Sequence, residues 1–396
     1  MKYSNVASSI TESRTLQVTS LIKKLKAEGH NVLTFSAGEP DFPTPKFICD
    51  AGIQAIEKGI TKYTNAEGSP ELIKAIVEKF KNENNINYEP AEIVVSSGAK
   101  NSLYNALFAL CNPGDEVILQ SPYWVSYIEM IKLVSAVPVI LPTSFETGFK
   151  LTVEQIEAAI TPKTKAILLN SPSNPSGAVY TEEELRNIAD LVKNRDIFIV
   201  TDEIYEKLIY DGASHFSIAS IPEIRDKVVT INGMSKSFSM TGWRIGYLGT
   251  NKELAILIKN FQSHAVSHPS TISMAASVAA LKMDPSVVEG MREQFEKRRN
   301  FLFDALSEIN GLKLFKPTGA FYLFFDVSNF YGKEYNGFKV EDSTSFCSYV
   351  LNEGKIGIVP GEAFGDDNCV RMSFAYSEAD LSEGVKRLKE ALNKLK

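Results

Sequence analysis

Seven short apolar runs alternate with stretches of helical pattern through the middle of this chain. They are Glu92 to Val95, Glu116 to Gln120, Val137 to Leu141, Lys165 to Leu169, Ile197 to Thr201, Val228 to Ile231 and Ile245 to Leu248. Thr152 to Gln155 and Thr181 to Glu184 are capping boxes, and Ser69-Pro70 is a further helix start. The alternation predicts a mostly parallel seven-stranded sheet between helices, in one large α/β domain.

The pattern changes after about Met283, and 396 residues exceed what one hydrophobic core usually supports. An amphipathic stretch from Val288 to Ile309 leads into a mixture of short strands and helices, ending in a helix from Ser377. We therefore expect a large domain over residues 46–285. A smaller α+β domain is expected from residues 1–45 and 286–396 together, because the large sheet offers the N-terminal segment no obvious place.

Composition narrows the functional classes. A hydrophobic content of 44% with 23% charged residues is ordinary for a soluble globular protein. The net charge of −6 and the lack of a basic block argue against nucleic-acid and membrane partners. No signal peptide or membrane-length apolar stretch is found, and Cys49, Cys111, Cys347 and Cys369 lack the spacing of a metal site or a disulfide framework. We expect a cytoplasmic protein without a metal.

Lys236 lies in a serine-rich run, Ile231 to Arg244, that follows a strand-like segment. A free lysine amine has a pKa of about 10.4 and is a poor nucleophile at neutral pH. A lysine becomes reactive when a folded site removes its proton or ties it up as an imine. Serines with a downstream arginine suit the phosphate of pyridoxal phosphate, the cofactor that lysine imines most often carry. The alternative is a surface loop with a solvated lysine.

Polar residues also follow other strands. Asp202 ends the run Ile197 to Thr201, and Asn174 lies in a loop stiffened by two prolines after Lys165 to Leu169. Ligands of open α/β sheets bind outside the carboxyl ends of the strands. A buried Asp202 there needs a partner, which the ring nitrogen of pyridoxal phosphate would provide. The alternative for Asp202 is an aspartate that caps the next helix, and the alternative for the loop with Asn174 is a plain turn.

Three motifs occur in a fixed order: Asn-Pro-x-Gly at 174–177, Asp-x-x-Tyr at 202–205, and Ser-Lys followed by Thr-Gly-Trp-Arg at 235–244. Together they resemble the class I pyridoxal-phosphate aminotransferases of fold type I. The resemblance extends from Ala37–Phe42 to Val370–Ser373. Through Ser121–Tyr127 it is similar to the bacterial aspartate aminotransferase subgroup in particular.

For the cofactor, the resemblance implies that Lys236 forms the Schiff base and then carries a proton between the substrate and the cofactor. Asp202 would hold the ring nitrogen in its protonated form. Tyr205 and Asn174 would bond to the ring hydroxyl, and Trp124 would stack on the ring. Core packing is the alternative for this tryptophan.

At the phosphate, the resemblance implies contacts from Arg244 and from the amides of Gly98 and Ala99. The amides at a helix start form an anion site. Many relatives carry a serine three residues before the lysine, where this chain has Gly233. Ser235 is the candidate replacement.

For the substrate, Arg371 would bind the α-carboxylate, since a guanidinium matches a carboxylate. An exposed arginine on an edge strand is the alternative. Gly38 would add an amide, with Trp124 and Asn174 close by. Lys100 would contact both the cofactor and the substrate, and its ammonium would favour substrates with a second carboxylate. Ser13-Arg14-Thr15 would add contacts that favour prephenate.

The resemblance predicts an enzyme that moves the α-amino group of aspartate or glutamate to 2-oxoglutarate or oxaloacetate by a ping-pong mechanism. Tyr63 would reach the phosphate of the neighbouring subunit, so the active unit would be a homodimer. The alternatives are a prephenate, aromatic or broad-specificity aminotransferase and a C–S lyase. A pyridoxal-phosphate-binding regulator would need a DNA-binding module, and a nicotinamide enzyme a Gly-x-Gly-x-x-Gly motif; neither is present.

Overall fold

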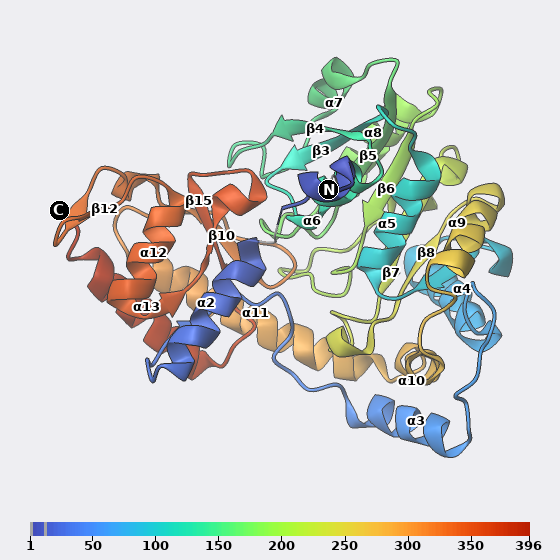
Figure 1. Cartoon of the computed structure of the whole chain (residues 1–396), viewed down its shortest axis with the longest axis horizontal. Coiled ribbons are helices and arrows are strands. Elements are labelled where there is room, and N and C mark those ends of the chain that lie inside the picture. Colours follow the sequence, from blue (N-terminus) through green and yellow to red (C-terminus); the bar gives the residue numbers. More distant parts are fainter. Residues whose placement is uncertain (1–2, 12–13) are drawn as a thin grey trace.

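A computed structural model describes residues 3–11 and 14–396, with the side chains of residues 14–19 left out. A seven-stranded sheet forms the larger half of the molecule (Figure 1). Its strands are β2 (Ile93–Ser96), β3 (Glu116–Ser121), β4 (Val137–Pro142), β5 (Thr164–Asn170), β6 (Phe198–Asp202), β7 (Val228–Gly233) and β8 (Gly246–Gly249). All seven predicted strands are confirmed, each within two residues at either end.

The order of these strands is β2-β8-β7-β6-β5-β3-β4. β8 is antiparallel to β2 and β7, and every other neighbouring pair is parallel. The sheet is therefore mostly parallel, as predicted. Because β5, β6 and β7 run side by side in one direction, Asn170, Asp202 and Gly233 all lie at the same edge.

Helices cover both faces of this sheet, and all of its strands except the edge strand β4 are buried on both sides. Along β5, Ile167 and Leu169 pack into one core, while Ala166 and Leu168 pack into the other. Successive side chains of a strand point to opposite faces, so a strand buried on both faces is apolar throughout. One core contains residues of α4 (Pro70–Asn84), α8 (Glu182–Val192) and α10 (Thr271–Leu281), and the other contains residues of α5 (Ala99–Leu110), α6 (Ser126–Leu133) and α9 (Lys252–Ala265).

The predicted helix starts are confirmed. Thr152 and Thr181 form capping boxes before α7 (Val153–Ala159) and α8, and Ser69 caps α4 ahead of a proline. The remaining helix on this side is α3 (Lys46–Glu57), which packs against α10.

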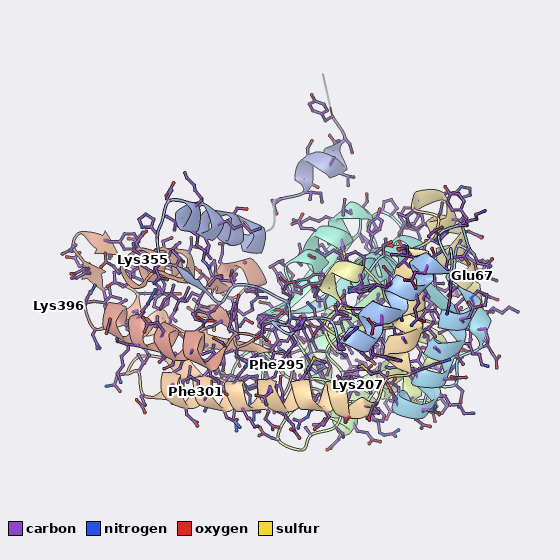
Figure 2. The ribbon with its side chains drawn as sticks, turned by 90° about the horizontal axis from the view of Figure 1, so that it is seen from below. Glu67, Lys207, Phe295, Phe301, Lys355 and Lys396 are labelled. Atoms are coloured by element: carbon purple, nitrogen blue, oxygen red, sulfur yellow. The ribbon has the colours of Figure 1, made fainter. Side chains whose placement is uncertain are left out.

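A four-stranded antiparallel sheet of order β14-β15-β10-β9 forms the smaller half. Its strands are β9 (Lys313–Leu314), β10 (Tyr322–Asp326), β14 (Val359–Pro360) and β15 (Cys369–Ser373), and it is covered by α12 (Ser343–Gly354) and α13 (Glu378–Leu392). β11 (Glu334–Tyr335) and β12 (Phe338–Lys339) form a separate hairpin. Helix α11 (Pro285–Ser307) runs along both halves (Figures 1 and 2).

The N-terminal segment divides between the two halves. β1 (Leu33–Thr34) pairs with β13 (Ile356–Gly357), and α2 (Arg14–Ala27) contacts β13 and β14, as expected of a part of the small domain. Helix α1 (Asn5–Ser9) instead contacts α6 on the large sheet. Thr11 fixes this position, because its amide and its hydroxyl both donate to the Glu129 carboxylate, each at 3.2 Å. The prediction that all of residues 1–45 pack with the small domain is thus wrong for residues 5–11.

Among the described helices, none combines the length and the apolar character that a membrane crossing requires.

Candidate active site

A cavity of about 290 Å³ lies where the carboxyl edge of the large sheet meets the small sheet. The large sheet and its helices supply an acid, a lysine and an arginine, while the small sheet supplies Tyr322 and Arg371. The lining residues are Ser36, Ala37, Gly38, Ala99, Lys100, Trp124, Tyr127, Asn170, Asn174, Asp202, Ile204, Tyr205, Ser235, Lys236, Thr241, Arg244, Tyr322 and Arg371.

Asp202, the last residue of β6, is 4% exposed. The Tyr127 hydroxyl donates to its Oδ2 at 2.8 Å, and the amide of Ile204 donates to its Oδ1 at 3.2 Å. Burial raises the pKa of Asp202 to about 6, against the opposing effect of these hydrogen bonds. Asp202 accepts a hydrogen bond from the amide two residues further along, as a helix-capping aspartate would, but it also lines the cavity. A cation beside it would stabilise the charged form.

Lys236 enters the same cavity from the segment after β7. Its amine donates to the carbonyl oxygen of Gly38. Burial lowers the pKa of this amine to about 8, even though Glu39 opposes the effect. A larger share of the amine is therefore neutral near neutral pH than in a solvated lysine, and a neutral amine can attack a carbonyl carbon.

The opposite end of the cavity suits an anion. Helix α5 begins at Ala99, directly after Gly98, whose φ of +93° is a conformation that glycine adopts without strain. A side chain at Gly98 would overlap the guanidinium of Arg244. Free amides at a helix start, beside an exposed arginine, form a binding site for phosphate. Ser235 also borders this region.

Gly233 has a structural explanation. A Cβ atom there would lie 2.9 Å from the carbonyl oxygen of Ile245 and 3.0 Å from Cα of Gly246, on the neighbouring strand β8. Such contacts require one strand to shift. The chain therefore has no room for a serine at this position, and Ser235, which lines the cavity, remains the candidate replacement.

Arg371 is 2% exposed, which excludes the solvent-exposed alternative. Its Nη1 donates to Asn174 Oδ1 at 2.9 Å and its Nη2 to the carbonyl of Ser36 at 2.8 Å, while its Nε is buried without a partner. Tyr322 lies under the guanidinium, 4.4 Å from ring centroid to Cζ, and its hydroxyl is 2.9 Å from that of Tyr205. This guanidinium retains an unused donor for an anionic ligand.

Trp124 borders the cavity rather than lying inside the core. Its ring meets that of Tyr127 edge to face, with centroids 5.3 Å apart, and the ammonium of Lys100 lies 4.7 Å from the Trp124 ring centroid. Lys100 thus adds a further basic group to the cavity.

Comparison with known proteins identifies the family. The family model for class I and II aminotransferases matches residues 30–388. This chain is a member of that family.

Its relatives match along nearly the whole chain. It is 46% identical over 385 residues to an aspartate aminotransferase of Bacillus sp. (strain YM-2), covering 97% of each chain. It is 44% identical over 393 residues to a bifunctional aspartate aminotransferase and glutamate/aspartate-prephenate aminotransferase of Petunia hybrida, covering 98% of this chain and 82% of that one. The crystal structure of the aspartate aminotransferase from Rhizobium meliloti superposes with a TM-score of 0.97 at 41% identity, covering 100% of both chains. The predicted family and fold are confirmed.

The aminotransferase cavity gathers almost all of the predicted residues. Only two of the predicted positions are not among its lining residues: Gly98, which adjoins Arg244, and Tyr63. Tyr63 is 90% exposed, against the ring of His268. Ser13 and the side chain of Arg14 lie outside the described residues.

Seven lining residues were not predicted, and three of them, Tyr127, Asn170 and Tyr322, have side chains that bond to predicted site residues. Asn170 Nδ2 donates to the backbone carbonyl of Asp202 at 2.9 Å, and its Oδ1 accepts from the amide of Asn174 at 2.8 Å. The signal for Asn170 was its place at a strand end, and that for Tyr127 was its place within the Ser121–Tyr127 motif. Nothing in the sequence around Tyr322 distinguishes it from a core aromatic residue.

The raised pKa of Asp202 predicts a pH-dependent stability. Without a bound cation, the folded protein holds a proton on Asp202 that the unfolded chain releases above about pH 4, so stability contributed by this group falls as pH rises to about 6. We expect Asp202→Asn to gain about 3 kcal/mol of unfolding free energy relative to the wild type between about pH 4 and pH 6, and no more above it. Denaturant unfolding of both cofactor-free proteins across this range measures the difference. A constant difference would contradict this account of Asp202.

Proposed function

We propose that this chain is an aspartate aminotransferase that uses pyridoxal 5′-phosphate. One observation supports the proposal above all. A lysine amine of lowered pKa, a buried carboxylate and a helix-start anion site face one cavity that also contains a buried arginine. Its substrates would be an acidic amino acid and a 2-oxo acid.

The residues present fit the cofactor. Lys236 offers an amine to the aldehyde, Asp202 a carboxylate to the ring nitrogen, and Arg244 with the start of α5 a site for the phosphate. Trp124 offers a face to the ring, and Tyr205 a hydroxyl to the ring oxygen. Pyridoxal phosphate, when bound, supplies an electron sink for the bonds of the substrate's α-carbon.

The chain's own residues would orient the substrate and carry the proton. Asp202 holds positive charge at the ring-nitrogen position, in a place where burial strengthens the interaction. When the Lys236 amine is not bonded to the cofactor, it would accept the proton of the substrate's α-carbon on its Nζ and release it again within the cavity. Arg371 would bind the α-carboxylate and so orient the substrate. Residues 36–38 line the same cavity.

Lys100 supports a dicarboxylic substrate. Arg371 accounts for one carboxylate, and Lys100 adds a further basic group to the cavity, beside Trp124. The names of the relatives from Bacillus and Rhizobium state aspartate, an amino acid with two carboxylates. Prephenate is the second candidate acceptor, because the name of the relative from Petunia includes it.

A homodimer and the domain division remain parts of this proposal. Tyr63 is 90% exposed and does not line its own cavity, as expected of a side chain that completes a neighbour's site. On α3, Ile53 and Ile56 are 54% and 56% exposed, opposite the face that packs against α10. An exposed apolar helix face is typical of a subunit interface.

We propose that residues 46–285 form the large domain and that residues 1–45 and 286–396 form the small domain, except that residues 5–11 pack on the large domain. A cytoplasmic location is consistent with four free cysteines.

Lys236→Ala tests the proposal directly. Hydride reduction of the wild-type protein should fix the cofactor to the peptide that contains Lys236, and the variant should lose this adduct together with about 10²- to 10⁴-fold or more of its transfer rate. Mass spectrometry of the digested protein locates the adduct, with Lys74→Ala, an exposed lysine on α4, as the control. An adduct that persists in Lys236→Ala would contradict the proposal.

Lys100→Ala should discriminate between substrates. We expect kcat/KM for aspartate to fall roughly ten- to 100-fold, the value of a charged hydrogen bond, with less than about a threefold change for alanine. Lys100→Arg should retain most of the preference. Steady-state rates with the two amino acids measure it. Equal losses would assign Lys100 to the cofactor instead of the substrate.

The Ile53→Arg/Ile56→Arg double variant should favour the monomer, because two buried, unpaired charges oppose association. The dimer and the activity should be lost together if Tyr63 completes the neighbouring site. Light scattering after gel filtration, with Ile140→Arg on the exposed edge of β4 as the control, measures the mass in solution. A fully active wild-type monomer would refute the shared site.

A further inference from the structure

A second group of charged residues lies behind the segment that carries Asp202 and Tyr205. These two side chains line the cavity, but Glu203 and Glu206, one position further along, do not. The turn that follows β6 places the two pairs of side chains on different sides, because residues three apart in a tight turn lie on the same side. Glu203 and Glu206 are 1% and 8% exposed, so two more acidic groups are buried next to the site.

Glu206 is bound to helix α4. Its carboxylate forms an ion pair with Lys79, and the two side chains are 5% and 4% exposed. Asn84, at the end of α4, links both, because its Oδ1 accepts from Lys79 at 2.7 Å and its Nδ2 donates to Glu206 at 2.8 Å. Burial opposes ionisation of Glu206, but Lys79 and His215 nevertheless hold its pKa down to about 2.

Glu203 is bound to the segment after the turn. Ser217 donates to its Oε1 at 2.8 Å and Thr201 at 3.2 Å, while His215 Nε2 lies 3.0 Å from its Oε2. Burial lowers the pKa of His215, but the two glutamates outweigh this effect and raise it. The Nδ1 atom of His215 is buried without a partner.

Glu203, Glu206 and His215 have the composition of a metal site, with ligand atoms within 4.8 Å of one another. The cation is already supplied by the chain, however, because the ammonium of Lys79 is bonded to Glu206. Buried ion pairs of this kind add little stability, and apolar residues of similar volume often serve the fold as well or better. A role in shaping the neighbouring site gives a reason for burying them.

We propose that this buried network, Lys79–Glu206 with Glu203–His215, holds the turn from Asp202 to Tyr205 in the shape that presents both side chains to the cofactor. Glu203 and Glu206 are then positioning residues, which act through Asp202 and Tyr205 without touching substrate. The network ties the turn from two directions, to α4 by Glu206 and to residues 215–217 by Glu203. The inference rests on the proposed function.

Glu206→Gln tests this role in the full-length holoenzyme, because it leaves the buried Lys79 ammonium with only the more distant Glu83 carboxylate, 3.9 Å away, as an anion. We expect cofactor affinity to fall roughly tenfold and the pH midpoint of the bound cofactor's absorption band to move by about one unit. The Lys79→Met/Glu206→Gln double variant removes the unpaired ammonium but leaves the ion pair that ties the turn to α4 broken, so both quantities should stay changed. Recovery in this variant would assign the loss to the unpaired charge alone and would overturn the inference. Lys74→Gln, at an exposed lysine of the same helix α4, should change neither.

A purely structural role would lower the unfolding temperature of Glu206→Gln while leaving the absorption midpoint and the cofactor affinity at wild-type values, and that result would overturn the inference. If Glu206→Gln does not fold, His215→Leu and His215→Gln provide the same comparison, since only glutamine can still donate to Glu203; equal midpoints would again overturn it. Stoichiometric metal at the cluster would do so too. A wild-type protein that takes up no cofactor on Lys236 would refute the proposed function instead.

Discussion

A carboxylate inside a protein is unfavourable unless something stabilises its charge, and Asp202 is such a group. The described structure gives it two direct hydrogen-bond donors, the Tyr127 hydroxyl and the Ile204 amide, and both are neutral. Burial raises its pKa to about 6, an effect that these two donors only partly offset. Lys236, another charged group of the cavity, lies close to this carboxylate. Lys236 is close enough to favour the ionised form but has a lowered pKa of its own, so the two groups do not simply form an ion pair.

These groups meet because the parallel strands that precede them run in the same direction. Parallel strands end at one edge, so the residues after β5, β6 and β7 meet, although Asn170 and Lys236 are far apart in the chain. The small sheet completes the cavity from the other side with Arg371 and Tyr322. Arg371 bonds to Asn174 of the large half, and Tyr322 to Tyr205. The site therefore depends on how the two halves meet, and any change in that packing alters the position of Arg371.

Most strands of the large sheet could be predicted because all but the edge strand β4 are buried on both faces, which makes their sequences largely apolar. The helix starts at Thr152 and Thr181 were equally readable, since a cap depends on residues within one turn. The placement of residues 5–11 was not readable. That segment is held by the contact of Thr11 with Glu129, between residues 118 positions apart, and no local pattern encodes it.

The sequence by itself determined the chemistry that is available: one lysine in a serine-rich loop, an acid and an asparagine after strands, and an ordered set of motifs that identifies the family. Only the tertiary structure decided what those groups experience. The pKa values of Asp202 and Lys236 move because the fold removes water from them, and burial is a property of the assembled chain. The same holds for Gly233, whose missing side chain is explained by the strand β8 that the fold places beside it.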